Sequence, residues 1–154
     1  MIKLSLGQIA NAISGEIVVG DSASEVFGTV RTDSRLVEPG DIFFAKLGEN
    51  EDGHRYLESL VSKASLAIVS SPRLDLPLAQ VKVADTVVAL SLLAEFVLSQ
   101  VRPNGLKVIG ITGSNGKTSA KNMLAAITAK VGKTISPQDS FNNEVGLPLT
   151  VLRL

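Results

Sequence analysis

The stretch KVIGITGSNGKT at residues 107–118 constrains the fold of this chain more than any other feature. Its first half is apolar and rich in β-branched residues, which is typical of a buried strand in a parallel sheet. Apolar residues then recur at helical spacing, so a helix is predicted from Lys117 to about Val131. A strand, a glycine loop and a helix in this order predict a phosphate-binding site, because the start of the helix offers free N–H groups and the positive end of its dipole.

The glycine loop contains the residue types that a bound triphosphate needs. Gly113 and Gly116 permit unusual backbone angles and let a ligand approach closely. The Lys117 ammonium would reach the β- and γ-phosphates of ATP, and the Thr118 hydroxyl would bind Mg²⁺. The strict motif has a glycine where this chain has Ile111, so a helix-ending turn with an incidental lysine is the alternative. The residues expected to bind the nucleotide are Gly113, Ser114, Asn115, Gly116, Lys117, Thr118 and Ser119, and Thr118 is also the expected metal ligand.

The composition excludes several classes of protein. The 154 residues are 45% apolar and carry 15 basic and 15 acidic side chains, which argues against a nucleic-acid surface built on bulk charge. Without cysteine, the chain has no disulfide, thiolate metal site or cysteine nucleophile. The most hydrophobic window, residues 87–98, is too short to span a bilayer, and no signal peptide pattern is present. A cytoplasmic protein without membrane insertion is therefore expected.

Residues 1–102 alternate between predicted strands and predicted helices, which indicates an α/β domain. Ser5 and Gln8 have capping-box spacing at the start of a helix that Gly15 ends. Strands are predicted at residues 16–19, 27–35, 42–45, 66–70 and 81–83, and helices at residues 6–13, 54–64 and 86–101. The side chains expected to face the core from the two later helices are Tyr56, Leu57, Leu60 and Val61, then Val88, Leu92, Leu93, Phe96 and Val97.

A domain boundary is predicted at Arg102-Pro103-Asn104-Gly105, because proline and glycine interrupt two strongly periodic segments there. Residues 1–102 would form the first domain and residues 103–154 the start of a doubly wound nucleotide-binding domain. After the phosphate loop and its helix, only a probable strand at residues 133–135 and a short final segment remain. A doubly wound sheet needs further βα units to cover both faces, so a truncated fragment of a longer protein is expected.

Three blocks of the sequence resemble the Mur ligases, the ATP-dependent amino-acid-adding enzymes of peptidoglycan synthesis. The block at residues 109–118 is similar to the ATP loop of that family, which shares the same short glycine spacing. The second block, made up of residues 32–35, 39–45 and 52–54, resembles the family's N-terminal domain, which holds a UDP-sugar substrate. The block at residues 141–150 is similar to that of the family member that adds D-alanyl-D-alanine. The resemblance extends from about Leu4 to Leu154 and corresponds to the first third of a family member.

The resemblance implies an amide ligation in two steps with UDP-N-acetylmuramoyl-tripeptide, D-alanyl-D-alanine, ATP and Mg²⁺. A phosphoryl group from ATP would activate the carboxylate of the tripeptide as an acyl phosphate, and the amine of the dipeptide would then displace phosphate. Lys117 would be the catalytic residue, since charge neutralisation dominates such transfers. Thr32 and Ser34 would contact the uracil end of the substrate. The other implied substrate-binding residues are Glu49, Asn50 and Glu51 around the same site, and Asn142 or Asn143 at the junction between nucleotide and substrate.

The resemblance also implies what this chain lacks. The second magnesium-binding carboxylate, the modified lysine and the C-terminal domain of the family would lie beyond Leu154, so Glu144 is not assigned to metal binding. The fragment by itself is expected to be inactive and monomeric. The alternatives are a Mur ligase that adds diaminopimelate or lysine, a folate polyglutamylator with the same loop, and a non-catalytic module that binds a UDP-sugar.

Three residues allow other interpretations. His54, near Asp52, is more consistent with a structural role in the first turn of a helix than with catalysis. Asn143 could cap a helix as well as contact a ligand. The family often has a basic residue directly before the glycine at position 48, whereas this chain has Leu47 there and Lys46 one place earlier. Strand alternation would turn Lys46 to the other face, so no substrate contact is assigned to it.

Overall fold

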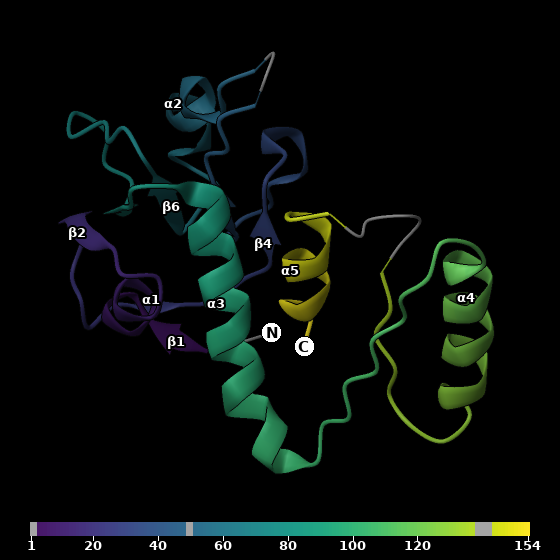
Figure 1. Ribbon diagram of the computed structural model, residues 1–154. Coiled ribbons are helices and arrows are strands. Elements are labelled where there is room, and N and C mark those ends of the chain that lie inside the picture. Colours follow the sequence, from purple (N-terminus) through teal and green to yellow (C-terminus); the bar gives the residue numbers. More distant parts are fainter. Residues whose placement is uncertain (1–2, 49–50, 138–142) are drawn as a thin grey trace.

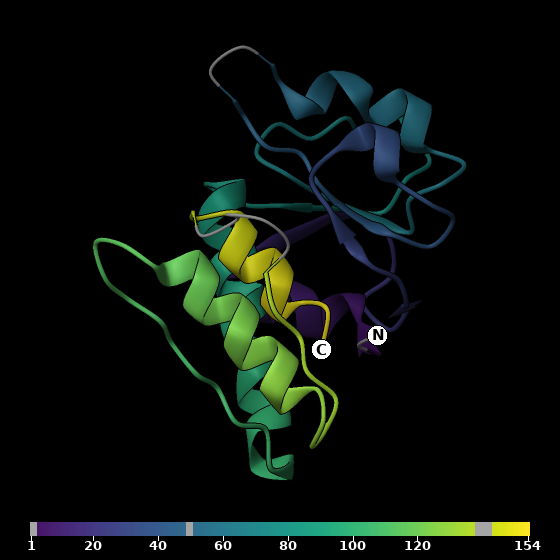
Figure 2. The same ribbon diagram turned by 90° about the vertical axis from the view of Figure 1, so that its right-hand side faces the viewer.

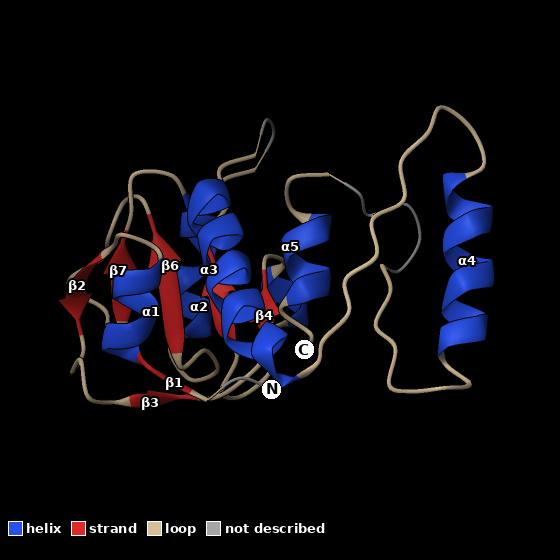
Figure 3. Cartoon of the chain, turned by 60° about the horizontal axis from the view of Figure 1, so that its bottom comes forward, coloured by secondary structure: helices blue, strands red, loops and turns tan. Residues whose placement is uncertain are grey.

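The computed structural model describes residues 3–48, 51–137 and 143–154. Most of these residues form an α/β unit around one sheet, and a single helix stands apart from it (Figures 1 and 3). The isolated helix is α4 (Lys117–Thr128), and irregular residues 105–116 link it to the unit. The C-terminal helix α5 (Gly146–Val151) returns to the unit and lies against α3 (Thr86–Val101).

The main sheet has five strands in the order β2-β7-β6-β5-β4. The four strands β4 to β7 are parallel to one another, and β2 pairs antiparallel with β7 at the edge of the sheet. The central strands β5 and β6 are buried throughout, as expected of parallel strands covered on both faces. β1 and β3 pair to form a separate two-stranded antiparallel sheet. The strands are β1 (Leu4–Ser5), β2 (Glu16–Val19), β3 (Glu25–Val26), β4 (Val30–Arg31), β5 (Ile42–Phe44), β6 (Leu66–Val69) and β7 (Gln80–Lys82).

The helices of the unit begin where the sequence supplies caps. Ser5 and Gln8 form the predicted capping box at the start of α1, and the Asp85 carboxylate accepts hydrogen bonds from the first N–H groups of α3. Short helical turns follow β4 and β5. The remaining helical elements are α1 (Leu6–Ala12), η1 (Ser34–Leu36), η2 (Gly53–Tyr56), α2 (Leu57–Leu60) and η3 (Arg102–Asn104).

Two hydrophobic cores cover the two faces of the sheet. Alternate residues of β5 divide between them, with Phe44 in the core beneath α1 and α3 and Phe43 in the core beneath α2. Neighbouring Ile68 and Val69 of β6 divide in the same way. Figure 2 shows α2 on one side of the sheet and α3 and α5 on the other.

Helix α5 is part of the first core although it follows the phosphate loop in the sequence. Leu152, directly after α5, is only 6% exposed, and Leu149 and Val151 pack against the same cluster. The predicted domain boundary between residues 102 and 103 is therefore crossed by a contact, since α5 follows the boundary and packs against α3, which precedes it. The division itself stays a prediction.

Two predicted strands in the C-terminal part do not form. Residues 107–111 and 133–135 are irregular, and Val108 and Ile109 are 60% and 58% exposed. A strand requires partners for its backbone N–H and C=O groups, and no described strand lies beside these segments. The predicted helix at Lys117 is confirmed, but it ends at Thr128.

Several boundaries in the N-terminal part differ from the prediction. The predicted strand at residues 27–35 is reduced to β4, because the Asp33 side chain accepts the N–H of Arg35 and starts η1. The helix predicted at residues 54–64 is a 3₁₀ turn followed by the single turn α2. Tyr56 is 38% exposed and Val88 is 56% exposed, so these two side chains were wrongly placed in the core.

Helix α3 and the turn after it, Thr86–Asn104, are apolar enough to cross a membrane by length and composition, with a mean hydropathy of 1.3. A core helix passes the same test. The buried residues of α3, including Leu90, Leu93 and Val97, belong to the first core. This packing accounts for the apolar stripe that the sequence assigned to the core.

Replacing Leu152 by alanine is expected to lower the free energy of unfolding by about 2 kcal/mol, because the substitution leaves a cavity between α5 and α3. The matched control on α5 is Leu147→Ala, since Leu147 is 56% exposed and should change that energy by less than about 0.5 kcal/mol. Urea denaturation measures both. Equal effects of the two substitutions would contradict the packing of α5 on the unit.

Candidate functional site

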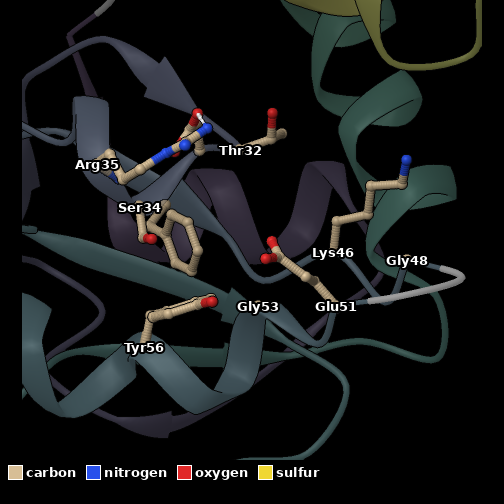
Figure 4. A pocket seen from close by; sticks show the side chains of 10 residues that line it. Thr32, Ser34, Arg35, Lys46, Gly48, Glu51, Gly53 and Tyr56 are labelled. Carbon is tan, nitrogen blue, oxygen red and sulfur yellow. Dashed lines mark hydrogen bonds and ion pairs between the residues drawn. The ribbon is translucent and has the colours of Figure 1, made fainter.

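A cavity of about 340 Å³ opens at one edge of the main sheet (Figure 4). It lies where β4 and β5 end, and the carboxyl ends of parallel strands are the usual position of a ligand site in an α/β sheet. The residues that line it are Thr32, Asp33, Ser34, Arg35, Phe43, Lys46, Gly48, Glu51, Gly53 and Tyr56.

The segment after β4 contributes two hydroxyl groups and an ion pair. Thr32 and Ser34, the two residues expected to contact the uracil end of a substrate, line the cavity on either side of Asp33. The Arg35 guanidinium donates to both oxygens of the Asp33 carboxylate, Nε to Oδ1 at 2.9 Å and Nη2 to Oδ2 at 2.7 Å. These side-chain hydrogen bonds, with that from the Arg35 backbone, lower the pKa of Asp33 to about 2. The charge of Arg35 is therefore paired with that of Asp33 within the same short segment.

A buried carboxylate joins the two strands that lead to the cavity. Asp41 is 4% exposed, and it accepts the backbone N–H groups of Thr29 at 2.8 Å and Glu38 at 3.0 Å. It also accepts Nε of Arg31, the last residue of β4, at 3.1 Å. Because Thr29 directly precedes β4 and Asp41 directly precedes β5, these bonds hold the starts of the two strands together, and the cavity lies at the other ends of the same strands.

The segment after β5 forms a short hairpin on the opposite side of the cavity. The N–H of Gly48 donates to the carbonyl of Glu51 at 2.8 Å, and the N–H of Gly53 donates to that of Lys46 at 2.9 Å. Glu51, which the sequence analysis expected to bound the substrate site, lines the cavity. Glu49 and Asn50, the other residues predicted here, lie outside the described residues.

Lys46 also lines the cavity, so the expectation that alternation turns it to the other face was wrong. Its N–H donates to the carbonyl of Phe44 at 2.9 Å, which forms a tight turn at the end of β5. Alternation holds only along an extended strand and ends at this turn. The turn was not visible in the sequence, because it contains neither glycine nor proline.

His54 holds the hairpin to the neighbouring strand and has the predicted structural role. Its Nδ1 lies 2.6 Å from Oδ1 of Asp52, and its Nε2 accepts the backbone N–H of Ser70 at 2.9 Å. The pKa of Asp52 is lowered, chiefly by a hydrogen bond from the backbone N–H of His54 and then by the imidazole. Ser70, His54 and Asp52 lie in the order of a catalytic triad. Because Nε2 of His54 already accepts a backbone N–H, however, it is not available to accept the proton of the Ser70 hydroxyl.

The predicted phosphate loop is a second candidate site, apart from the cavity. Residues 113–116 are exposed, Gly113 and Gly116 have φ angles of +149° and +78°, and a Cβ on Gly116 would meet nothing within 4 Å. The Lys117 ammonium folds back over the loop and donates to the carbonyls of Gly113 and Ser114. Thr118 and Ser119 are exposed in the first turn of α4. The loop thus has an open backbone with a cation at its mouth.

No group of three or more His, Asp or Glu side chains suited to a metal ion occurs among the residues that the structure describes. Thr118 therefore stays the predicted metal ligand of this chain. Asn143 lies just before the last helix, and its Oδ1 accepts the N–H of Gly146, the first residue of that helix, at 2.8 Å. Asn142 lies outside the described part of the chain.

The structure thus brings Thr32, Ser34 and Glu51 into one cavity and leaves the phosphate loop and Asn143 as separate features. The sequence analysis did not assign Phe43, Tyr56 or Arg35 to the site. A signal was present for two of them, because Phe43 and Arg35 belong to the blocks that resemble a known family, whereas Tyr56 lies outside those blocks.

Comparisons with known proteins agree on one family. The family described as the Mur ligase middle domain matches residues 111–154. A UDP-N-acetylmuramoyl-tripeptide–D-alanyl-D-alanine ligase from Mycobacterium tuberculosis is 38% identical over 176 residues, which cover 99% of this chain and 34% of the relative. The ligase of the same name from Escherichia coli is 37% identical over 154 residues, covering 100% of this chain and 33% of the relative.

Solved structures give the same result. A crystal structure of MurF from Acinetobacter baumannii matches with a TM-score of 0.89 and 35% identity over 100% of this chain and 34% of that chain. The MurF ligase from Thermotoga maritima in complex with ADP matches with a TM-score of 0.71 and 28% identity over 82% of this chain and 29% of that chain. The chain spans about a third of the length of these relatives.

The low pKa of Asp33 predicts the pH range of its ion pair. Because the folded-state pKa of about 2 lies below the ordinary 3.8, the pair stabilises the cavity above pH 3.8 and is lost as the pH falls through about 2. The pair is solvent-exposed, so this stabilisation is small. An NMR titration of the Asp33 carboxyl carbon should give a midpoint near 2, and Arg35→Gln should raise it towards 3.8. Arg73→Gln, which breaks the separate pair with Asp75, is the control and should leave Asp33 unchanged.

Proposed function

The chain belongs to the Mur ligase family, and on that premise we propose that it works as part of an ATP-dependent ligase that joins D-alanyl-D-alanine to a UDP-N-acetylmuramoyl-tripeptide. The observation that carries the proposal is the cavity, because it gathers three residues that the sequence assigned to the UDP-sugar site. The relatives that match nearly the whole chain have this activity in their names.

The cavity suits the nucleoside end of such a substrate. Its volume of about 340 Å³ lies within the usual range of small-molecule sites, roughly 300–1,000 Å³. The Thr32 and Ser34 hydroxyls both donate and accept hydrogen bonds, which matches the carbonyl and N–H groups of uracil. Glu51 would bound the site from the hairpin, together with Glu49 and Asn50. Asn143, with Asn142 beside it, would lie at the junction between substrate and nucleotide.

The loop at residues 113–119 would hold the phosphates of ATP. Its two glycines leave room for a ligand next to the backbone, and α4 directs its first N–H groups and its positive dipole end towards that space. The Lys117 ammonium would exchange its contacts with two loop carbonyls for contacts with phosphate oxygens. The Thr118 hydroxyl would hold Mg²⁺.

When bound, ATP supplies the phosphoryl group that activates a carboxylate for amide formation. The contribution of this chain to that step is position and charge. Lys117 would neutralise negative charge on the phosphates, and the cavity would fix the far end of the UDP-linked substrate. The absence of cysteine fits a reducing cytoplasm, and we propose a monomeric enzyme there.

A second candidate function is a non-catalytic module that binds a UDP-sugar. The observation that favours it is the contrast between the two sites, since the cavity lies at the edge of the packed α/β unit and the exposed phosphate loop lies on the helix that stands apart from that unit. A Mur ligase that adds diaminopimelate or lysine would share both sites. The amino acid or dipeptide that stimulates phosphate release distinguishes these ligases, and phosphate release itself distinguishes a ligase from a module.

Calorimetry with UDP-N-acetylmuramoyl-tripeptide tests the proposed substrate site. The chain is expected to bind this ligand, and Ser34→Ala should weaken binding about tenfold, because it removes one hydrogen bond to uracil. Ser62→Ala removes an exposed hydroxyl outside the cavity and should not change the affinity. Failure of the unsubstituted chain to bind the UDP-linked ligand would refute the proposal.

A further inference from the structure

We infer that Lys46 binds the diphosphate group of the UDP-sugar substrate in the cavity, an assignment that rests on the proposed function and goes one step beyond it. The Lys46 side chain lines the cavity, although the sequence argued against a contact there. The relevant ligand chemistry is a nucleoside diphosphate, whose charge lies outside the base and the ribose.

The charges of the cavity leave Lys46 as its available cation. Four charged side chains line the cavity, two acidic and two basic. Arg35 is held at both ends of its fork by the Asp33 carboxylate, so this pair contributes little net charge. Lys46 has no ion-pair partner within the part of the chain that the structure describes. An anion that enters the cavity therefore finds one ammonium free to pair with it.

The backbone of Lys46 is fixed before any ligand binds. Its N–H donates to the carbonyl of Phe44, and its carbonyl accepts the N–H of Gly53. A Cβ at position 53 would lie 3.0 Å from the nitrogen of Lys46, so a glycine there permits this close approach. The preceding residue, Ala45, is held by the Thr86 hydroxyl, which donates to its carbonyl at 3.1 Å. Only the flexible part of the side chain remains to be ordered when an anion binds.

Glu51 and Lys46 point in different directions, and this suits them to different parts of the ligand. Figure 4 shows the Glu51 carboxylate and the Lys46 ammonium extending in different directions from the hairpin. A carboxylate accepts hydrogen bonds from ribose hydroxyls, and it repels phosphate. Glu51 therefore suits the ribose, and Lys46 suits the diphosphate beyond it. An ammonium carries three donors on one compact charge, which fits phosphate oxygens without demanding a planar arrangement.

Calorimetry with two commercial ligands tests this assignment, because UDP carries the diphosphate and uridine does not. Lys46→Met should weaken UDP binding about tenfold and leave uridine binding unchanged. Lys46→Arg keeps the charge and should retain most of the affinity for UDP. The matched control is Lys63→Met, which removes an exposed lysine outside the cavity and should change neither affinity.

The outcomes separate this inference from the proposed function. Unchanged UDP binding by Lys46→Met overturns the inference while the uridine pocket stands. If the unsubstituted chain binds neither ligand, both the inference and the proposed UDP-sugar site fail. A second measurement needs no variant: the affinity of the unsubstituted chain for UDP should fall with added salt, whereas that for uridine should not. Equal salt dependence of the two ligands would also overturn the role of Lys46.

Discussion

A single buried carboxylate, Asp41, joins the starts of the two strands, β4 and β5, that lead to the cavity. It satisfies two backbone N–H groups and one guanidinium from the segment around β4, and it stands directly before β5. Removing one partner of such a buried charged group leaves the others unpaired, which is costly. The spacing between the starts of β4 and β5 thus follows from electrostatics as well as from the strand ladder. The two sides of the cavity lie at the other, carboxyl ends of these short strands.

The close contacts around Asp41 require glycine at one position. Gly28 has a φ angle of +145°, and a Cβ there would lie 2.2 Å from the carbonyl oxygen of Gly40. The chain segments before β4 and before β5 can therefore meet backbone to backbone, which brings Thr29 within reach of the Asp41 carboxylate. His54 has the corresponding role on the other side of the cavity, where it joins the hairpin to the end of β6 through hydrogen bonds at both ring nitrogens.

The sequence predicted the α/β unit well because local signals and burial agree there. The apolar runs of β5 and β6, the capping box at Ser5 and the Asp85 cap of α3 each specify one element without reference to the rest. The segment at residues 107–111 shows the limit of this reasoning. Its composition is that of a buried strand, yet a strand forms only beside a partner, and the described residues supply none. A composition pattern predicts which structure a segment can adopt, and tertiary contacts decide whether it does.

The candidate site was predictable to a similar extent. Thr32, Ser34 and Glu51 do meet in one cavity, because they follow the ends of neighbouring parallel strands. The position of Lys46 was not predictable, since it depends on a hydrogen bond between residues two apart in a segment without glycine or proline. The contact of α5 with α3 was also missed. The final apolar residues of the chain gave no sign of which partner would bury them.

We propose that this chain has two ligand sites, a cavity for a UDP-linked substrate and a loop for nucleotide phosphates. Backbone amide NMR of the 16.2 kDa chain during separate titrations with UDP-N-acetylmuramoyl-tripeptide and ADP tests this claim most directly. The UDP-linked ligand should shift amides of residues 32–35 and 46–56, and ADP should shift those of residues 113–119 in the unsubstituted chain but not in Lys117→Met. An ADP response confined to the cavity, or none in the loop, would contradict the account.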